Sequence, residues 1–198
     1  MPILYHSPNS RSSSILTLID ELGADIDIVE VTIPRQDGSG APDPRNPHPE
    51  KKVPYLVDGD DKIRERGAII LHLTDSYPQA GLGPVHGAPG RGAYLSWLFY
   101  YQGVMEPVIL TQWAQVDHPV IKAGLGDFAT MTKQLSSGLQ DQPYLLGDGY
   151  SAADLLCSSP FIWFPEATPD DPAIKSWVQR CRDRPAAIRT AKREGVAT

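Results

Sequence analysis

Residues 52–69 carry the most structural information in this chain. They read Lys52-Val53-Pro54-Tyr55-Leu56-Val57-Asp58-Gly59-Asp60-Asp61-Lys62-Ile63-Arg64-Glu65-Arg66-Gly67-Ala68-Ile69. Residues 53–57 form an apolar, β-rich run, and residues 58–60 are a turn sequence typical of a β-hairpin. Residues 62–64 fit the returning strand, and the apolar spacing of residues 67–77 is helical and ends before Pro78. The stretch therefore predicts strand, hairpin, strand and helix.

Two positions within this stretch point to a ligand. A proline at the start of a strand is hard to place inside a sheet. A cis Val53–Pro54 bond would leave the Val53 N–H and C=O free to pair with an extended peptide, whereas a trans Pro54 at a sheet edge is the common alternative. Glu65-Arg66-Gly67 stands where a helix begins, so unpaired N–H groups and the helix dipole would favour an anion there. The alternative is that Glu65 caps its own helix.

The segment before this stretch alternates strands and a helix. Residues 3–6 are a short strand candidate, and residues 12–22 have helical apolar spacing that Gly23 stops. Residues 26–33 alternate β-branched and polar side chains and predict a second strand. A loop rich in proline and glycine follows at residues 34–49. The predicted order is strand, helix, strand, loop, strand, strand, helix.

The remainder of the chain is predicted to be helical. Residues 79–90 are rich in glycine and proline and predict a linker. Helices are expected at residues 91–105, 120–139, 151–159, 174–182 and 185–194. We therefore expect an α/β domain at residues 1–78, a linker at 79–90 and an all-α domain at 91–198.

Composition excludes several classes of protein. The 198 residues are 41% hydrophobic and carry a formal net charge of −6, which argues against nucleic acid or an anionic membrane as a partner. Cys157 and Cys181 are too few for a disulfide framework or a cysteine-rich metal site. No signal peptide and no membrane span is evident, so we expect a cytoplasmic protein without a metal.

The motifs together resemble one family. The chain combines Ser7-Pro8-Asn9-Ser10-Arg11-Ser12 after the first strand, Asn46-Pro47-His48-Pro49-Glu50-Lys51-Lys52-Val53-Pro54, Glu65-Arg66-Gly67-Ala68-Ile69, a capping box in Gly149-Tyr150-Ser151-Ala152-Ala153-Asp154 and the closing segment 177–186. This set resembles the cytosolic glutathione transferases of bacterial type. The resemblance implies a thioredoxin-like N-terminal domain, an all-α C-terminal domain, glutathione as cosubstrate and a homodimer.

The resemblance also implies a glutathione site. Glutathione would run antiparallel to the Val53 backbone beside a cis Pro54, with its γ-glutamyl carboxylate at the helix start formed by Glu65, Arg66 and Gly67. Its glycyl carboxylate would lie near Lys52, with His48 and Lys51 as weaker choices. Arg66 departs from the usual Ser or Thr; its side chain would bind the carboxylate directly, or point to solvent while its N–H binds.

A bound thiol needs stabilisation as thiolate, which hydrogen-bond donors at a helix N-terminus can supply. Serine-type members of the family place a hydroxyl just before the first helix. Ser10 is the first candidate, Ser12 the second and Asn9 the third; Tyr5 is also possible. In the cysteine-bearing subclass the cysteine would align with Arg11, and no cysteine precedes Cys157. We therefore expect the serine-bearing form of the loop.

In such proteins the electrophile binds between the domains, and aromatic side chains form its wall. Tyr100, Tyr101 and Trp113 are the candidates, although aromatics at helical spacing usually pack in a core. The two cysteines are expected to be buried rather than reactive. The leading hypothesis is a glutathione transferase acting on a small apolar electrophile. The alternatives are a glutathione-dependent peroxidase, isomerase or etherase, and a non-catalytic glutathione-binding or regulatory protein.

Overall fold

A computed structural model describes residues 1–196 of the chain. Its contacts divide the chain into two units: Met1–Ala80 together with the segment that begins at Pro185, and Gly81–Arg184. Among the described residues, no helix is long and apolar enough to cross a membrane. The segment from Pro185 was expected in the helical domain, but it groups with the first unit because helix α9 (Pro185–Arg193) packs on helix α1 (Ser13–Leu22).

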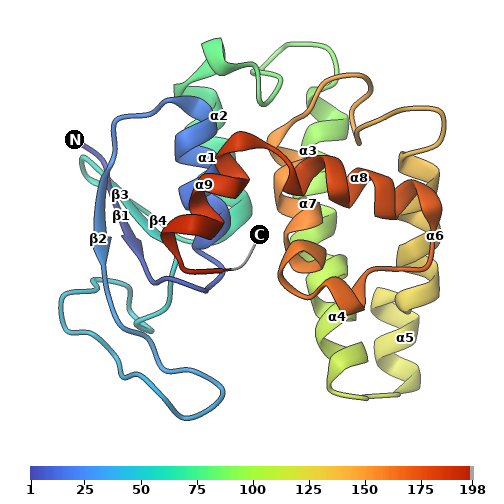
Figure 1. The fold of residues 1–198 in the computed structure, drawn as a ribbon, viewed down its shortest axis with the longest axis horizontal. Coiled ribbons are helices and arrows are strands. Elements are labelled where there is room, and N and C mark those ends of the chain that lie inside the picture. The colour runs from blue at the N-terminus through green and yellow to red at the C-terminus, as the bar shows by residue number, and fades with distance from the viewer. Residues whose placement is uncertain (197–198) are drawn as a thin grey trace. The chain divides into compact units, whose positions relative to one another are not determined.

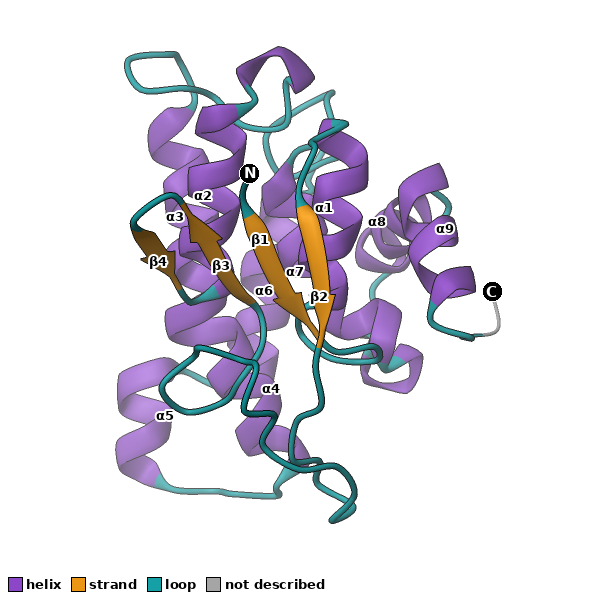
Figure 2. Ribbon diagram, turned by 90° about the vertical axis from the view of Figure 1, so that its left-hand side faces the viewer, coloured by secondary structure: helices purple, strands orange, loops and turns teal. Residues whose placement is uncertain are grey.

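The first unit is built on a four-stranded mixed sheet (Figure 2). The strands are β1 (Ile3–His6), β2 (Asp27–Glu30), β3 (Tyr55–Asp58) and β4 (Asp61–Ile63), in the spatial order β2-β1-β3-β4. β1 pairs parallel with β2 and antiparallel with β3, and β3 pairs antiparallel with β4. Helices α1 and α2 (Arg66–Ser76) lie on one face of this sheet (Figures 1 and 2). The predicted order of elements is confirmed.

Two strands are shorter than their patterns predict. β2 ends at Glu30 rather than Ile33, because the Thr32 N–H donates to the Asp43 carboxylate of the following loop at 3.3 Å instead of continuing a ladder. β3 begins at Tyr55 rather than Val53, because the Val53–Pro54 bond is cis and Pro54 has no N–H to donate.

The second unit is helical (Figure 1). Its helices are α3 (Arg91–Tyr100), α4 (Glu106–Trp113), α5 (Pro119–Leu125), α6 (Phe128–Gly138), α7 (Ala152–Trp163) and α8 (Pro172–Arg182). A π-helical turn at Tyr101–Met105 connects α3 to α4, and a 3₁₀ turn lies at Pro165–Ala167. A further 3₁₀ turn, at Pro78–Ala80, belongs to the first unit. Helix α7 is the core element: its residues 152–158 are all buried, and it packs against α3 and α8.

The predicted helix at residues 120–139 is wrong as a single helix. Gly126 adopts a positive φ of 80°, and Asp127 then starts α6 by accepting the Thr130 N–H at 2.8 Å. The predicted helix at 151–159 runs further, to Trp163, despite Pro160. Pro160 cannot bond the Leu156 carbonyl, but the Ser159 hydroxyl donates to that oxygen at 2.7 Å.

Candidate functional site

The segment that joins β1 to α1 contains a hydrogen-bonded serine cluster. The Ser10 hydroxyl lies 2.7 Å from both the Ser7 carbonyl oxygen and Ser12 Oγ, and its oxygen accepts the Ser12 N–H at 3.1 Å. Ser12 Oγ accepts the Ser7 N–H at 3.1 Å and lies 2.8 Å from His6 Nδ1. Ser10 is 8% exposed and Ser12 is fully buried. Ser10 is therefore the less deeply buried of the two predicted hydroxyls.

Asn9, the third candidate, is engaged with the segment that follows α9. Its φ is 54°, a left-handed conformation that asparagine tolerates. Its N–H donates to Glu194 Oε2 at 2.8 Å, and its side-chain amide donates to the Glu194 carbonyl oxygen at 3.2 Å. The Asn9 side chain thus binds the protein's own C-terminal segment.

Arg35 holds the same segment from the long loop. Its guanidinium donates to the Pro8 carbonyl oxygen at 2.7 Å, to the Asn9 carbonyl oxygen at 2.9 Å and to Ser7 Oγ at 3.3 Å. These three hydrogen bonds from the Arg35 guanidinium hold the loop before α1 in place, and the guanidinium adds a positive charge beside the loop. Sequence reasoning missed Arg35, because it lies in an irregular proline-rich loop with no periodic pattern.

His6 and Glu194 were also missed. His6 is 1% exposed, and burial, with a smaller contribution from the charge of Arg193, lowers its pKa to about 4, so its ring is neutral near pH 7. The Glu194 side chain is 3% exposed; its Oε2 accepts from the Asn9 N–H and the Ser13 hydroxyl at 2.8 Å each, and its Oε1 lies 3.4 Å from His6 Nε2. His6 lies two residues after the buried Leu4 on β1, so the alternation of the strand places both side chains on the same face of the sheet. This is the sequence signal that could have indicated the cluster.

Tyr5 and Arg11 have other surroundings. The Tyr5 ring lies 6.4 Å from the Tyr55 ring across the β1–β3 pair, and Tyr5 is half-buried. Arg11 is exposed.

The Val53–Pro54 bond is cis, as the resemblance implies. Val53 is nearly buried, yet among residues 1–196 neither its N–H nor its C=O makes a hydrogen bond. A buried backbone amide normally finds a partner. The edge at Val53 is therefore open to pairing with an extended peptide.

The residues before Val53 hold this segment in place. The Asn46 side chain is buried; its amide donates to the Lys52 carbonyl oxygen at 3.0 Å, and its Oδ1 accepts the His48 N–H. His48 is buried and stacks edge-on against Tyr55, and Lys51 Nζ donates to the Asn46 carbonyl oxygen at 2.6 Å. Lys52 is the exposed cation; its Nζ pairs with Glu50 at 2.5 Å.

At the start of α2, Glu65 has a left-handed φ of 69° and its side chain does not cap the helix. The interpretation of Glu65 as merely a cap is therefore wrong. Arg66 is 5% exposed, which contradicts the alternative that its side chain points to solvent. Glu65 is exposed and Gly67 half-buried. This helix start combines a buried guanidinium with an exposed carboxylate.

The three aromatic candidates have different surroundings. Tyr101 is 2% exposed and belongs to the core. Tyr100 is half-buried against Trp97, and burial raises the pKa of its hydroxyl. Trp113 is 55% exposed and packs edge-on against Phe164, with the two ring centroids 4.6 Å apart. The structure leaves Tyr100 and Trp113, but not Tyr101, accessible.

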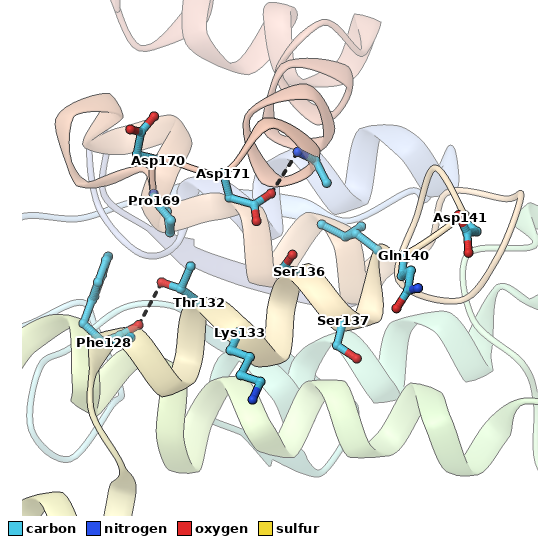
Figure 3. A pocket seen from close by; sticks show the side chains of 13 residues that line it. Phe128, Thr132, Lys133, Ser136, Ser137, Gln140, Asp141, Pro169, Asp170 and Asp171 are labelled. Carbon is cyan, nitrogen blue, oxygen red and sulfur yellow. Dashed lines mark hydrogen bonds between the residues drawn. The ribbon is translucent and has the colours of Figure 1, made fainter.

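Both cysteines are buried, as predicted, and burial raises the pKa of Cys181 to about 12. A shallow hollow lies elsewhere in the second unit, on α6 and the turn before α8 (Figure 3). Phe128, Thr132, Ser136 and Asp171 line it, and Asp171 is committed there to capping α8. None of the predicted site residues lines this hollow.

Comparison with known proteins agrees with this arrangement. The family model for the glutathione S-transferase N-terminal domain matches residues 4–81. The disulfide-bond oxidoreductase YfcG of Escherichia coli is 29% identical over 92% of this chain and 91% of that protein. A glutathione transferase of Methylococcus capsulatus has a TM-score of 0.80 at 27% identity, covering 98% of this chain and 99% of that one. A sphingomonad glutathione S-transferase complexed with glutathione has a TM-score of 0.78 at 26% identity, covering 98% and 100%.

These similarities identify the fold. The four-stranded unit is the thioredoxin-like N-terminal domain of the glutathione transferase fold, and a helical region follows it. They also support a glutathione transferase family for the chain.

Proposed function

We propose, from the glutathione transferase fold of this chain, that it binds glutathione, activates it as thiolate and conjugates it to a small, largely apolar electrophile. The observation that carries the proposal is the Val53 backbone, which has no hydrogen-bond partner among residues 1–196 and lies beside the cis Pro54. Its N–H and C=O offer a peptide backbone one donor and one acceptor, as an unpaired strand edge does. Two of the similar proteins are named as glutathione transferases, and one of them was solved with glutathione.

The helix start at α2 would hold the γ-glutamyl end. The buried Arg66 guanidinium and the N–H groups at the start of the helix are donors for its carboxylate. Exposed Glu65 is an acidic partner for its ammonium. Lys52, on the exposed side of the Val53 segment, is the cation for the glycyl carboxylate.

We expect Glu65→Gln to weaken glutathione binding about tenfold, because one charged pair of roughly 1.4 kcal/mol is lost. Titration calorimetry with reduced glutathione measures the affinity. Asp61→Asn is the matched control, since Asp61 is an exposed carboxylate in the adjacent hairpin. An equal loss in both variants would show that general charge, rather than Glu65, determines affinity.

The thiol would lie at the start of α1. Ser12 occupies the N-cap position of this helix, and the helix dipole there favours an anion. The Ser13 and Ile15 N–H groups already donate to the carbonyl oxygens of Ser10 and Ser12 at 3.0 Å, so a side-chain donor is needed for the sulfur. Ser10 is the hydroxyl that would donate to sulfur, since it is the least deeply buried member of the serine cluster.

We expect Ser10→Ala to raise the pKa of bound glutathione by about one unit, because a hydrogen bond to a charged group contributes roughly 1.5 kcal/mol. Ultraviolet absorbance of the thiolate during a pH titration measures it. Ser14→Ala is the control, because Ser14 is in the same helix start but donates to the Arg11 carbonyl oxygen. An unchanged pKa in Ser10→Ala contradicts the assignment.

A second candidate function is glutathione-dependent reduction of disulfides. It is favoured by the similarity to a protein named as a disulfide-bond oxidoreductase. Both cysteines here are buried, so the attacking thiol would be that of glutathione. Parallel assays with an aryl halide and with a small organic disulfide separate the two activities. Retention on immobilised glutathione without turnover in either assay would favour a binding protein.

A further inference from the structure

Four side chains form a continuous polar chain between the C-terminal segment and the loop before α1. Glu194 Oε1 lies 3.4 Å from His6 Nε2, His6 Nδ1 lies 2.8 Å from Ser12 Oγ, and Ser12 Oγ lies 2.7 Å from Ser10 Oγ. All four side chains are buried. We call this set the relay. Its order, carboxylate to imidazole to hydroxyl, is the order found in Ser-His-Glu triads, here extended by one more serine.

The hydrogens of the relay can be assigned by counting donors. Glu194 Oε2 already accepts two hydrogens, from Asn9 N–H and Ser13, whereas Oε1 is buried and has no hydrogen-bond partner among the described residues. His6 Nε2 is the polar atom facing it. An ionised carboxylate only accepts, so the single hydrogen of the neutral imidazole is favoured on Nε2.

The rest of the relay follows from this tautomer. With its hydrogen on Nε2, His6 must accept at Nδ1, and the Ser12 hydroxyl is the donor there. Ser12 Oγ is then an acceptor towards Ser10. The Ser10 hydrogen therefore has two internal acceptors at 2.7 Å, Ser12 Oγ and the Ser7 carbonyl oxygen. Every hydroxyl of the relay points inward, and a thiolate must compete with two acceptors for the Ser10 hydrogen.

We propose that Glu194 is a positioning residue: its carboxylate keeps the His6 hydrogen on Nε2, orients the relay inward, and so limits how readily Ser10 donates to a bound thiolate. The inference rests on the proposed function, since the thiolate is that of glutathione. Arg11 in the loop before α1, Arg35, which binds that loop, and Arg193, whose charge helps to lower the pKa of His6, are cations and cannot accept the Nε2 hydrogen.

Glu194→Gln reverses the relay without changing its shape. The position of Oε2 accepts two hydrogens, so the glutamine must place its carbonyl oxygen there. Its NH₂ then faces His6 Nε2 and donates to it, which moves the imidazole hydrogen to Nδ1. Nδ1–H donates to Ser12, and the Ser12 hydroxyl then has two acceptors, Ser10 Oγ at 2.7 Å and the Ser7 carbonyl oxygen at 3.2 Å. Ser10 Oγ is the nearer of the two, so the Ser12 hydroxyl turns towards it and Ser10 loses Ser12 as an acceptor for its own hydrogen.

The first test needs no glutathione. Nitrogen-15 NMR of histidine-labelled protein reports the tautomer of His6, with His6→Asn used to assign the signals. We expect the Nε2–H form in the wild type and the Nδ1–H form in Glu194→Gln. An Nδ1–H signal in the wild type, or no change in the variant, overturns the proposal. If the protein fails to bind glutathione, the proposed function fails and this measurement still decides the relay.

The second test measures the bound thiol. We expect Glu194→Gln to lower its pKa by about half a unit, because fewer acceptors compete for the Ser10 hydrogen. Removing the negative charge of Glu194 would also lower the pKa of the bound thiol, so Glu194→Gln is made in the Ser10→Ala background as well. A smaller shift there supports action through Ser10. An equal shift in both backgrounds shows a charge effect alone and overturns the positioning role, while leaving glutathione binding established.

Discussion

Replacing Asp154 by alanine should lower the free energy of unfolding by about 4 kcal/mol, the largest effect expected for a single substitution in this chain. Asp154 is fully buried and accepts four hydrogens: from the Leu145 N–H at 2.8 Å, the Ser151 N–H and hydroxyl at 2.9 and 2.7 Å, and Trp177 Nε1 at 2.9 Å. Alanine would leave these donors buried without partners. Urea unfolding followed by circular dichroism measures the loss.

The matched control is Asp127→Ala. Asp127 also starts a helix of the second unit and accepts from the N–H and hydroxyl of Thr130, but it is exposed. We expect this substitution to cost about 1 kcal/mol, because water can replace the lost partner. Similar losses at the two positions would show that Asp154 acts as an ordinary helix cap and not as the hub of a buried network.

Acidification should destabilise the protein through His6. Its pKa is 6.5 in an unfolded chain and about 4 when folded, because burial and Arg193 disfavour the charged ring. Between these two pKa values the unfolded state binds more protons than the folded state. The contribution of His6 to the free energy of unfolding is therefore fully present above pH 6.5 and is lost as the pH decreases towards 4. The loss attributable to this group is roughly 3 kcal/mol.

The measurement is the free energy of unfolding from about pH 7 to about pH 4, for the wild type and for His6→Asn. We expect a shallower decrease in the variant, which has no group to titrate at this position. Burial also lowers the pKa of His48, but His48 is present in both proteins and its contribution cancels. Parallel pH profiles would mean that the pKa of His6 is the same in the folded and unfolded states, which contradicts the shift that burial is expected to cause.

The elements with strong local patterns were predictable. The hairpin at Gly59, the helix ended by Gly23 and the capping box of Ser151 and Asp154 each depend on residues adjacent in the chain, and the structure has all three. The break before Asp127 was missed, because the apolar spacing continues across Gly126 and only the backbone turn interrupts the helix. Local patterns report helical faces better than helical ends.

The surroundings of the candidate site residues were predictable only where they are local. Ser10, Ser12 and the Val53–Pro54 segment lie within short motifs, and their surroundings follow from the neighbouring residues. Glu194 contacts Asn9 across 185 positions of sequence, and Arg35 reaches Pro8 from the irregular loop. Neither contact is indicated by hydrophobic periodicity or by local composition in the sequence. Long-range polar contacts of this kind require the three-dimensional structure.

The pairing of α9 with α1 has a consequence for how the protein is made. The thioredoxin-like unit is discontinuous in sequence: Thr17 and Asp20 on α1 meet Thr190 and Arg189 on α9, with the whole helical unit encoded between them. During synthesis, units that are contiguous fold as they emerge. Here the first unit to leave the ribosome lacks its last helix until translation reaches residues 185–194. The loop before α1 therefore acquires its hydrogen bonds to Glu194 only after the whole helical unit has been synthesised.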